Sequence, residues 1–568
     1  MLEVLYRSQG ARVCEYRRGD ATMQTPFLVS YVGESDTEQD GALAVDGTGR
    51  VYRFCGITLR RDELIQPPKS SRLETAPARF PEFPEAVAVR LPLPSDLSGL
   101  RETDLIILEN AFELRSDARM MVDVICRLRS ECGYRPLIYT PGLADPSNMA
   151  LLAYMGVDVF DDLYPLVRSQ EDICVSSVGE LLSAADLRQG EEAASFNRSE
   201  AERECRLISY YIRKGRLREL VDMRVASSPW SVAVLRLHDR TGYNLMEERC
   251  AFSGDTLSCN TTQSLQRPEI KRFRQKVLSG YRPPEHKRVL VLLPCSARKP
   301  YSLSKSHKLF SSAIRTGDHE TLVHEVIVTS PLGLVPRELE TFYPANAYDI
   351  PVTGEWKPEE KGFIHEMLAK LLDHGYDVVV NHLGSGYEFL DDLAEMRRTV
   401  LGDPTSPASL QHLDCTLREV TAEMPRESYQ TDRMNTMRSI LHFQFGEAGD
   451  YILPGAHVTG KYPFWKIFHG GTQLGMLTGD RGMVSLTLEG AERLMRSGSK
   501  AVQIEDFPLK GNLFAVGVTA ADPSIRIGDE VAVCYGDELR GVGVALMPGS
   551  DMCFLKRGIA VKIRHKKK

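Results

Sequence analysis

The chain has 568 residues, 42% of them hydrophobic and 26% charged, which is typical of a folded globular protein and excludes a largely disordered one. Its formal net charge of −7 argues against a protein that coats nucleic acid without selectivity. A chain of this length exceeds a single hydrophobic core, so we expect roughly three to five domains.

The sequence indicates a cytoplasmic protein that needs no metal. No apolar run approaches the roughly 20 residues that span a bilayer. The first residues, MLEVLYRSQGARV, lack the pattern of a signal peptide. The 12 cysteines stand singly and form no CxxC pair, so neither a zinc site nor a disulfide framework is readable.

Residues 1 to about 280 alternate between strand and helix patterns, which predicts a parallel α/β sheet or barrel. The expected strands and helices are strands at 104–110, 135–142 and 157–162, a helix over 117–132 that ends at Gly133, and a helix that starts at Pro146–Ser147 and ends at Gly156. The stretch 199–225 is predicted to form a long charged helix on the outside.

A second α/β unit follows a joint at 279–288 that is rich in proline and charge. Its predicted strands and helical patterns are strands at 289–294, 323–330 and 376–382, and helices at 308–317 and 360–375. Strands alternating with helices predict a core domain with a parallel sheet.

The remaining chain changes character twice. From about 445, short strands, many glycines and one helix start predict a small α+β module. After 496, alternating strands and turn glycines predict a small β-barrel, with three strands over 525–547. The expected domains are therefore 1–282, 283–442, 443–495 and 496–568.

The first strand of the second unit ends in a dense polar loop, PCSARKPYSLSKSH, over Pro294–His307. Ligands of open parallel sheets bind beyond the carboxyl ends of the strands. Nearby cations and a helix start at Ser304 or Ser306 would raise the thiolate fraction of Cys295, which suits a nucleophile. The alternative is one more buried thiol beside solvated cations, and spacing alone favours neither.

Other polar side chains of the strand-end loops also have two interpretations. His307 could act as an acid or base, or cap its helix. Tyr301 could donate a proton, stack on a base, or be a half-buried aromatic residue. Ser304 is more typical of a helix N-cap than of a catalytic group. Asp349 and His382, at the neighbouring strand ends, are secondary candidates.

The motif resembles the signature of the archaeosine synthase family, which is Pro-Cys, three residues, Lys-Pro-Tyr, two residues, Ser, two residues, His. Every fixed position matches: Pro294, Cys295, Lys299, Pro300, Tyr301, Ser304 and His307. The resemblance covers nearly the whole chain. Residues 139–162 resemble tRNA-guanine transglycosylase-like domains, which are modified (β/α) barrels, and residues 511–567 resemble a PUA domain, a small RNA-binding barrel.

This resemblance implies an enzyme that modifies archaeal tRNA. Its implied target is the nitrile of 7-cyano-7-deazaguanine at position 15, in the D-loop. Either nitrogen from glutamine or ammonium gives the formamidine directly, or free lysine is added and a radical-SAM partner enzyme cleaves the adduct. No glutaminase domain is visible, which favours direct addition of an amine. No cofactor is implied, and a homodimer is expected from the family alone.

The N-terminal domain departs from true transglycosylases. It lacks their Asp-Ser-Gly-(Gly/Ser)-Phe-Gln stretch and keeps only Cys205 of their zinc site. Asp161 falls where their nucleophile stands, but a carboxylate without its acid/base partner cannot exchange a base. The resemblance therefore implies a domain that holds tRNA without catalysis. The rival functions are an active transglycosylase and a non-catalytic tRNA-binding subunit.

The resemblance also implies roles for the motif residues. A Cys295 thiolate would add to the nitrile carbon and give a thioimidate, with His307, Tyr301 or Lys299 protonating the nitrogen. An amine would then displace the thiol. Alternatively, the amine attacks directly and Cys295 only shapes the pocket.

A basic cluster at the C-terminal end indicates contact with RNA. From Lys510 to Lys568, ten Lys and Arg residues stand against six Asp and Glu residues. We expect Arg564, Lys566, Lys567 and Lys568 to contact phosphate. This electrostatic attraction weakens as the salt concentration rises. The alternative is a solvated tail that aids solubility.

Overall fold

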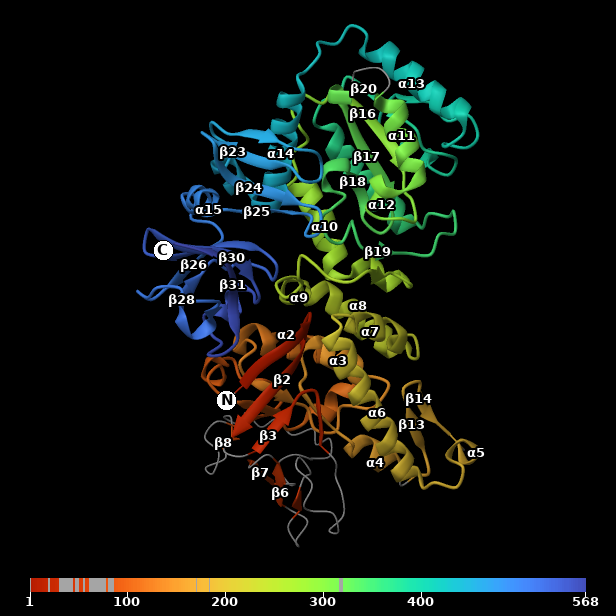
Figure 1. Ribbon diagram of the computed structural model, residues 1–568. Helices are drawn as coiled ribbons and strands as arrows, with labels where there is room; N and C mark the ends of the chain where they lie inside the picture. Colours follow the sequence, from red (N-terminus) through yellow and green to blue (C-terminus); the bar gives the residue numbers. More distant parts are fainter. Residues whose placement is uncertain are drawn as a thin grey trace. The chain divides into compact units, whose positions relative to one another are not determined.

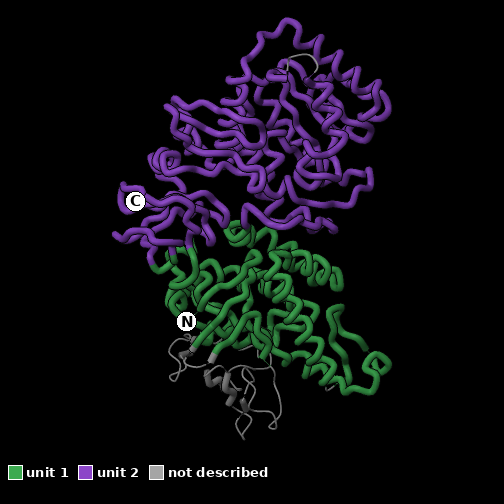
Figure 2. Tube along the Cα trace, in the orientation of Figure 1, with its two compact units in different colours: residues 1–250, 514–516, 550–559 green, residues 251–513, 517–549, 560–568 purple. Residues whose placement is uncertain are grey.

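The computed structural model describes residues 2–18, 21–29, 44–45, 51–54, 57–60, 78–79, 86–169, 171–182, 184–315 and 320–567. The chain divides into two compact units, which Figure 2 colours separately. Unit 1 comprises 1–250, 514–516 and 550–559, and unit 2 comprises 251–513, 517–549 and 560–568. Among the described residues, every helix is too short or too polar to cross a membrane.

Unit 1 is built on a sheet with the strand order β4-β12-β11-β10-β9-β8. Its parallel strands are β4 (Phe27–Val29), β9 (Ala86–Val89), β10 (Leu105–Leu108), β11 (Leu137–Tyr139) and β12 (Val159–Asp161), and β8 (Ala78–Arg79) joins antiparallel. The three predicted strands are confirmed as β10, β11 and β12. No pairing between described strands closes this sheet, so the transglycosylase-type barrel stays a prediction.

Two of the helices predicted for unit 1, over 117–132 and ending at Gly156, are largely confirmed. Helix α2 (Ala118–Cys132) ends at Gly133, whose φ of 73° only glycine adopts without strain. Helix α3 (Met149–Met155) ends at Gly156 as predicted, but it does not start at Pro146–Ser147. Those residues form a turn that is closed by the backbone N–H groups of Asn148 and Met149, which donate to the Asp145 carbonyl.

The long outer helix expected over 199–225 is wrong in two respects. The segment forms two helices, α6 (Ala193–Arg213) and α7 (Leu217–Val225). They are separated because Gly215 takes a φ of 67°, which is not a helical conformation. Helix α7 is not an outer helix, since the Arg218 side chain is fully buried and pairs with Asp222 and with Asp239 of the next helix, α8 (Pro229–Thr241).

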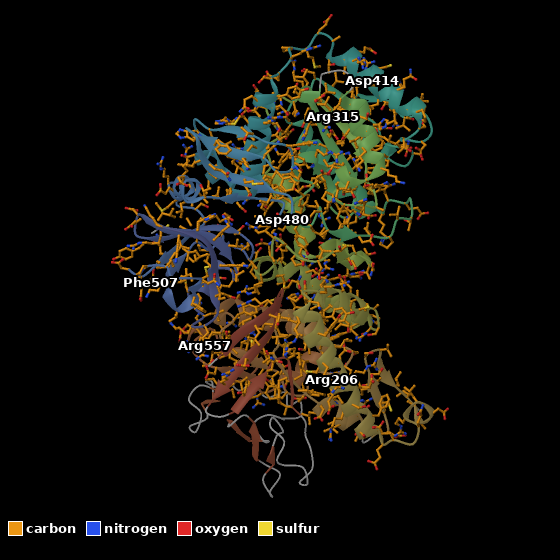
Figure 3. The ribbon with its side chains drawn as sticks, in the orientation of Figure 1. Arg206, Arg315, Asp414, Asp480, Phe507 and Arg557 are labelled. Carbon is orange, nitrogen blue, oxygen red and sulfur yellow. The ribbon has the colours of Figure 1, made fainter. Side chains whose placement is uncertain are left out.

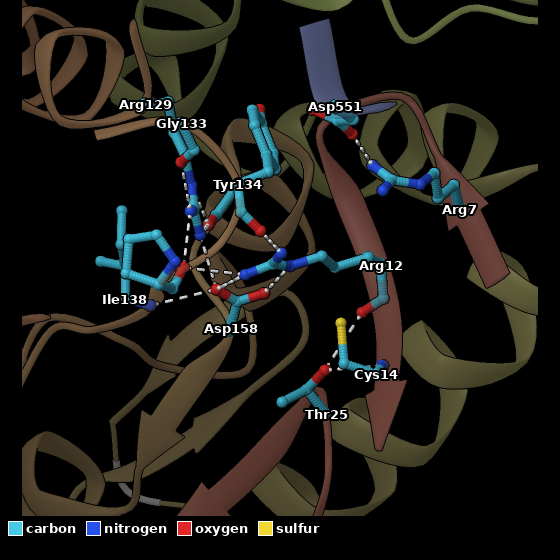
Figure 4. Close-up of polar contacts among 12 residues, drawn as sticks. Arg7, Arg12, Cys14, Thr25, Arg129, Gly133, Tyr134, Ile138, Asp158 and Asp551 are labelled. Carbon is cyan, nitrogen blue, oxygen red and sulfur yellow. Dashed lines mark hydrogen bonds and ion pairs between the residues drawn. The ribbon is translucent and has the colours of Figure 1, made fainter. Parts of the chain in front are cut away.

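A buried ion cluster joins the first strands of unit 1 to its sheet (Figure 4). The Asp158 carboxylate accepts from Arg12 Nε at 2.8 Å, from an Arg129 terminal nitrogen at 2.5 Å and from the backbone N–H of Ile138 at 3.0 Å. Burial alone would raise the pKa of Asp158, but the two guanidinium groups hold it below its ordinary value. One carboxylate therefore offsets two buried cations.

Replacing Asp158 with Asn should lower the free energy of unfolding of unit 1 by about 3–5 kcal/mol, because it leaves buried guanidinium groups without a counter-charge. Glu131→Gln is the control, since it breaks a partly exposed pair with Arg127 and should cost less than about 1 kcal/mol. Urea unfolding followed by hydrogen exchange in β11 and β12 measures both changes. Equal effects of the two substitutions would contradict this account.

The core of unit 2 is a five-stranded sheet with the order β18-β17-β16-β20-β21. Its strands are β16 (Val289–Pro294), β17 (Val323–Thr329), β18 (Gly333–Pro336), β20 (Val378–Asn381) and β21 (Met396–Arg398). All are parallel except β18, which runs antiparallel to β17. The three predicted strands are confirmed, and the strand that leads to Cys295 lies between the other two.

Alternate residues of β16 pack on opposite faces of this sheet. Val289, Val291 and Leu293 pack with residues of α11 (Lys305–Arg315) and α13 (Pro407–Thr421). Leu290 and Leu292 pack with residues of α10 (Pro268–Ser279) and α12 (Pro358–Leu372). Figure 1 shows the helices around the sheet, and Arg315 and Asp414 mark α11 and α13 in Figure 3. Every residue of the strand except Pro294 is therefore buried.

Besides the short β15–β19 pair (Leu257–Ser258 with Tyr348–Asp349), the described residues form two further sheets after residue 445. The expected α+β module contains β22 (His457–Thr459), β23 (Lys466–His469), β24 (Thr472–Thr478), β25 (Met483–Leu486) and helix α15 (Leu488–Met495). The C-terminal sheet contains β26 (Ala501–Ile504), β27 (Leu513–Phe514), β28 (Val518–Ala521), β29 (Glu530–Tyr535), β30 (Glu538–Ala545) and β31 (Ile559–Lys566).

Two details differ from expectation in unit 2. The strand expected at 525–527 is a turn, because Ile525 N–H donates to the Asp522 carbonyl and Gly528 takes a φ of 93°. Helix α10 precedes the predicted joint at 279–288, yet it lies in unit 2, and the units divide after Cys250. The four domain bounds remain predictions.

Candidate functional site

Cys295 lies at the exposed end of a buried strand. It follows Pro294 directly, and its side chain is exposed. Strand β16 lies between β17 and β20 with parallel register, so Cys295, Thr329 and the loop after Asn381 leave the sheet at the same edge. These three strand ends therefore lie at one edge of the sheet, and Cys295 is not a buried thiol.

Lys299 is half-buried beside this cysteine. Its ammonium lies 4.0 Å from the centre of the Tyr348 ring, a cation–π contact. Burial lowers the pKa of Lys299, and negative charge at Cys295 and Asp349 opposes that shift. Asp349 is exposed, on β19 (Tyr348–Asp349). The structure thus brings Cys295, Lys299 and Asp349 within electrostatic reach of one another.

Tyr301 is fully buried rather than half-buried. Its hydroxyl lies 2.6 Å from that of Tyr348, which lies 2.5 Å from Oγ1 of Thr329 at the end of β17. Burial raises the pKa of both phenols, and a thiolate at Cys295 raises each further. Both hydroxyls therefore stay protonated. Because Tyr301 is enclosed, it has no free face on which a base could stack.

Ser304 and His307 hold the start of α11. Ser304 Oγ accepts from the backbone N–H of His307 at 3.2 Å, the N-cap that its position predicted. An Arg337 terminal nitrogen donates to His307 Nδ1 at 2.7 Å, so the ring proton lies on Nε2. Burial lowers the pKa of His307 to about 3, and Arg337 lowers it as well. This geometry favours a positioning role for a neutral His307.

Arg337 ties the motif to the sheet. It follows β18 and pairs with Glu325 of β17 at 2.7 Å and with Glu340 at 2.9 Å. Glu340 also accepts the backbone N–H of Ser302 at 2.9 Å. The ionic network of Arg337, Glu325 and Glu340 therefore holds the loop from Cys295 to His307 at two points. One is the backbone N–H of Ser302 and the other is the side chain of His307.

The other two secondary candidates, His382 and Asp161, are buried and their polar atoms are engaged by other groups. His382 is fully buried, and both ring nitrogens are engaged, Nδ1 with Thr399 at 2.8 Å and Nε2 with the Pro404 carbonyl at 2.9 Å. Burial lowers the pKa of His382 to about 4, so it is a neutral structural group at physiological pH.

Asp161 belongs to unit 1, at the carboxyl end of β12. Burial raises its pKa to about 7, although the N–H of Gly142, the hydroxyl of Tyr139 at 2.9 Å and the N–H of Leu163 at 3.1 Å all donate to it. Those bonds orient the carboxylate firmly, which fits a structural group.

The C-terminal cations differ in how far they are engaged. Arg564 is bound to the buried carboxylate of Glu530 and donates to the Leu486 carbonyl at 2.7 Å. Lys566 donates to the Lys510 carbonyl at 3.2 Å, and Lys567 lies 3.3 Å from Glu492, both with exposed ammonium groups. Lys568 lies outside the described residues. Phosphate contact by this cluster stays a prediction.

Sequence reasoning missed three groups at this site: Tyr348, Arg337 and Tyr387. Tyr387 follows β20, and burial raises its pKa, as does charge at Cys295, so the two side chains are electrostatic neighbours. Its place at the end of the third strand-end loop was the signal available. Among the described residues, no group of three or more His, Cys, Asp and Glu side chains is arranged to hold a metal.

The neutral state of His307 gives a pH-dependent prediction. Its folded pKa of about 3 lies below the ordinary 6.5, so its stabilising contribution is complete above pH 6.5 and is lost as the pH falls towards 3. Between pH 7.5 and 5 the loss is about 2 kcal/mol. His307→Gln keeps an acceptor for Arg337 but cannot titrate, so that part of the pH dependence should disappear.

Urea titrations at both pH values measure this difference. The control is His365→Gln, which removes an exposed histidine and should keep the wild-type dependence. A His307→Gln variant with unchanged pH dependence would show that the wild-type ring is not held neutral.

Comparison with known proteins places this site in a described family. Residues 270–417 match a model described as Domain of unknown function (DUF5591), and residues 503–567 match the PUA domain. The archaeosine synthase subunit alpha of Methanosarcina acetivorans is 36% identical over 508 residues, which are 83% of this chain and 80% of that protein. The archaeosine synthase of Haloferax volcanii is 32% identical over 85% of each chain.

The chain is also similar, at lower identity, to a protein named as a transglycosylase. The tRNA-guanine(15) transglycosylase of Methanobrevibacter smithii is 27% identical over 74% of this chain and 65% of that protein. The two archaeosine synthases, in contrast, match more than four-fifths of this chain at higher identity. The chain carrying Cys295 and its neighbours therefore belongs to the archaeosine synthase family, and it ends in a PUA domain.

Proposed function

We propose that this chain modifies tRNA in archaeosine biosynthesis, adding an amine to the nitrile of 7-cyano-7-deazaguanine at position 15. The observation that carries the proposal is the exposed Cys295 at the end of β16, with the Lys299 ammonium beside it, in a chain of the archaeosine synthase family. The C-terminal PUA domain supports tRNA as the substrate.

The proposed reaction is covalent. The Cys295 thiolate adds to the nitrile carbon, and the electron pair of one C–N π bond moves to the nitrogen, which takes a proton from Lys299. The thioimidate is then attacked by an amine, the C–S bond breaks, and the thiolate leaves. The amine loses one proton, which restores Lys299. Atoms and charge balance without an oxidant, and the product is an amidine.

Lys299 is the proton donor that the geometry favours among the three candidates. His307 is neutral with a pKa of about 3 and is bound to Arg337, and Tyr301 is enclosed with a raised pKa. A lysine whose pKa is lowered gives up its proton more readily than an ordinary ammonium.

The amine donor remains open between lysine, glutamine and ammonium. If lysine is the donor, the adduct needs cleavage by a separate radical-SAM enzyme. Unit 1 would then hold the tRNA without exchanging a base, on a transglycosylase-type framework in which Asp161 is structural. The C-terminal cations would contact the tRNA backbone, with a strong dependence on salt.

Cys295→Ala should lower the rate of amine addition by about 10³-fold or more, because the covalent route is lost. Cys415→Ala, which removes another exposed thiol of unit 2 on α13, should leave the rate unchanged. Mass spectrometry of nitrile-bearing tRNA, with lysine, glutamine or ammonium supplied in turn, reports both activity and donor. Retained activity in Cys295→Ala would support direct attack by the amine.

Lys299→Met should lower kcat by about 10²–10⁴-fold, because the imide nitrogen loses its proton donor. In the wild type, kcat should fall as the pH rises through the Lys299 pKa, which lies below 10.5, and Lys299→Arg should move this fall to higher pH. Lys308→Met, an exposed lysine of α11, is the control. An alkaline limb that persists in Lys299→Met would rule out this role.

A further inference from the structure

Three aromatic side chains cluster on two of the loops at this edge of the sheet. Trp356 precedes α12, and Tyr387 and Phe389 follow β20. The Trp356 and Tyr387 ring centres lie 5.2 Å apart, those of Trp356 and Phe389 lie 5.9 Å apart, and the Tyr387 and Phe389 rings are stacked at 6.4 Å. All three are partly buried against the core, so each keeps some exposed surface. We call these residues the aromatic wall.

The aromatic wall lies at the same end of the sheet as Cys295. Leu292 and Asn381 are paired neighbours in the sheet. Cys295 lies three residues beyond Leu292, and the loop that carries Tyr387 starts within three residues of Asn381. The two loops of the wall also touch, because a Cβ built on Gly386 would lie 4.0 Å from the Gly354 carbonyl. Charge at Cys295 is felt at Tyr387. The cysteine and the wall therefore share one end of the sheet.

Chemistry on a nucleobase in folded tRNA requires that the base leave its stack. Enzymes that act on single bases hold the extruded ring against aromatic or apolar side chains. Stacking on an aromatic ring tolerates any planar base and strengthens binding beyond the contacts to the backbone. Tyr301 is enclosed and offers no such surface, whereas the aromatic wall does.

We propose that Trp356, Tyr387 and Phe389 form the surface on which the deazaguanine ring of the nitrile-bearing nucleotide stacks, which aims its nitrile carbon at Cys295. This inference rests on the proposed function. Trp356 and Tyr387 are then substrate-binding residues, and the ring plane determines the approach of the carbon to the thiolate.

Tryptophan fluorescence tests the contact without turnover. The chain has three tryptophans, at 230, 356 and 465. Free 7-cyano-7-deazaguanine, or tRNA that carries it, should quench the emission of the wild-type protein, and Trp356→Phe should abolish that quenching. Quenching that persists unchanged in Trp356→Phe would overturn the proposal.

Substitution of Tyr387 tests the energetic contribution. Tyr387→Ala should weaken binding of the free base by about 10-fold or more, whereas Tyr387→Phe, which keeps the ring, should stay near wild type. Tyr429→Ala, an exposed tyrosine of the same unit, is the control. Thermal unfolding checks each variant, and Tyr387→Leu replaces Tyr387→Ala if that variant does not fold.

The same measurements separate this proposal from the proposed function. If wild type adds no amine but quenching depends on Trp356, the base surface stands and the reaction fails. If wild type adds the amine while Tyr387→Ala binds the base as wild type does and quenching persists unchanged in Trp356→Phe, the reaction stands and the aromatic wall is refuted.

Discussion

The arrangement of the site depends on one largely buried guanidinium. Arg337 contacts Glu325 on β17, Glu340 beyond β18 and His307 on α11, and Glu340 holds the backbone N–H of Ser302. In water such bonds exchange freely. Inside the protein each unmade bond leaves a desolvated polar group, so the loop after β16 has one arrangement of low energy. Cys295 can be exposed and yet well placed because this frame is buried.

The motif Pro294–His307 therefore divides into two functional parts. Cys295 and Lys299 face the edge of the sheet where chemistry can occur. Ser304 caps α11, and His307 accepts from Arg337, so these residues position the loop. Tyr301 stands between the two parts, since its buried hydroxyl meets Tyr348 while charge at Cys295 still affects its pKa.

Local pattern was enough to predict much of the fold. The unbroken apolar run of β16 and the serine before the helical pattern of α11 are both properties of neighbouring residues, and both predictions are confirmed. The cysteine's position at a strand end also followed from the order of strands and helices. The break at Gly215 was missed because a single glycine inside a helical pattern is often tolerated.

Roles that depend on distant partners could not be predicted in this way. His307 is neutral because Arg337, 30 positions along the chain, donates to it, and Arg564 is engaged because Glu530, 34 positions away, is buried beneath it. Tyr387 and Trp356 were missed because aromatic residues in loops follow no periodic pattern that marks their surroundings. The polar strand-end loops could be predicted from the sequence, but only the folded chain shows which of their side chains are buried.

The pairing of Arg564 with Glu530 has a consequence for how tRNA would be selected. A cation that neutralises an internal carboxylate is unavailable for a tight, oriented contact, which leaves loosely held ammonium groups such as Lys566 and Lys567 at the C-terminal end. Attraction of that kind is indifferent to the nucleotide sequence and lengthens residence on any tRNA. If these ammonium groups contact tRNA, discrimination among tRNAs would have to come from residues outside this cluster, so residence and selection would be separate tasks.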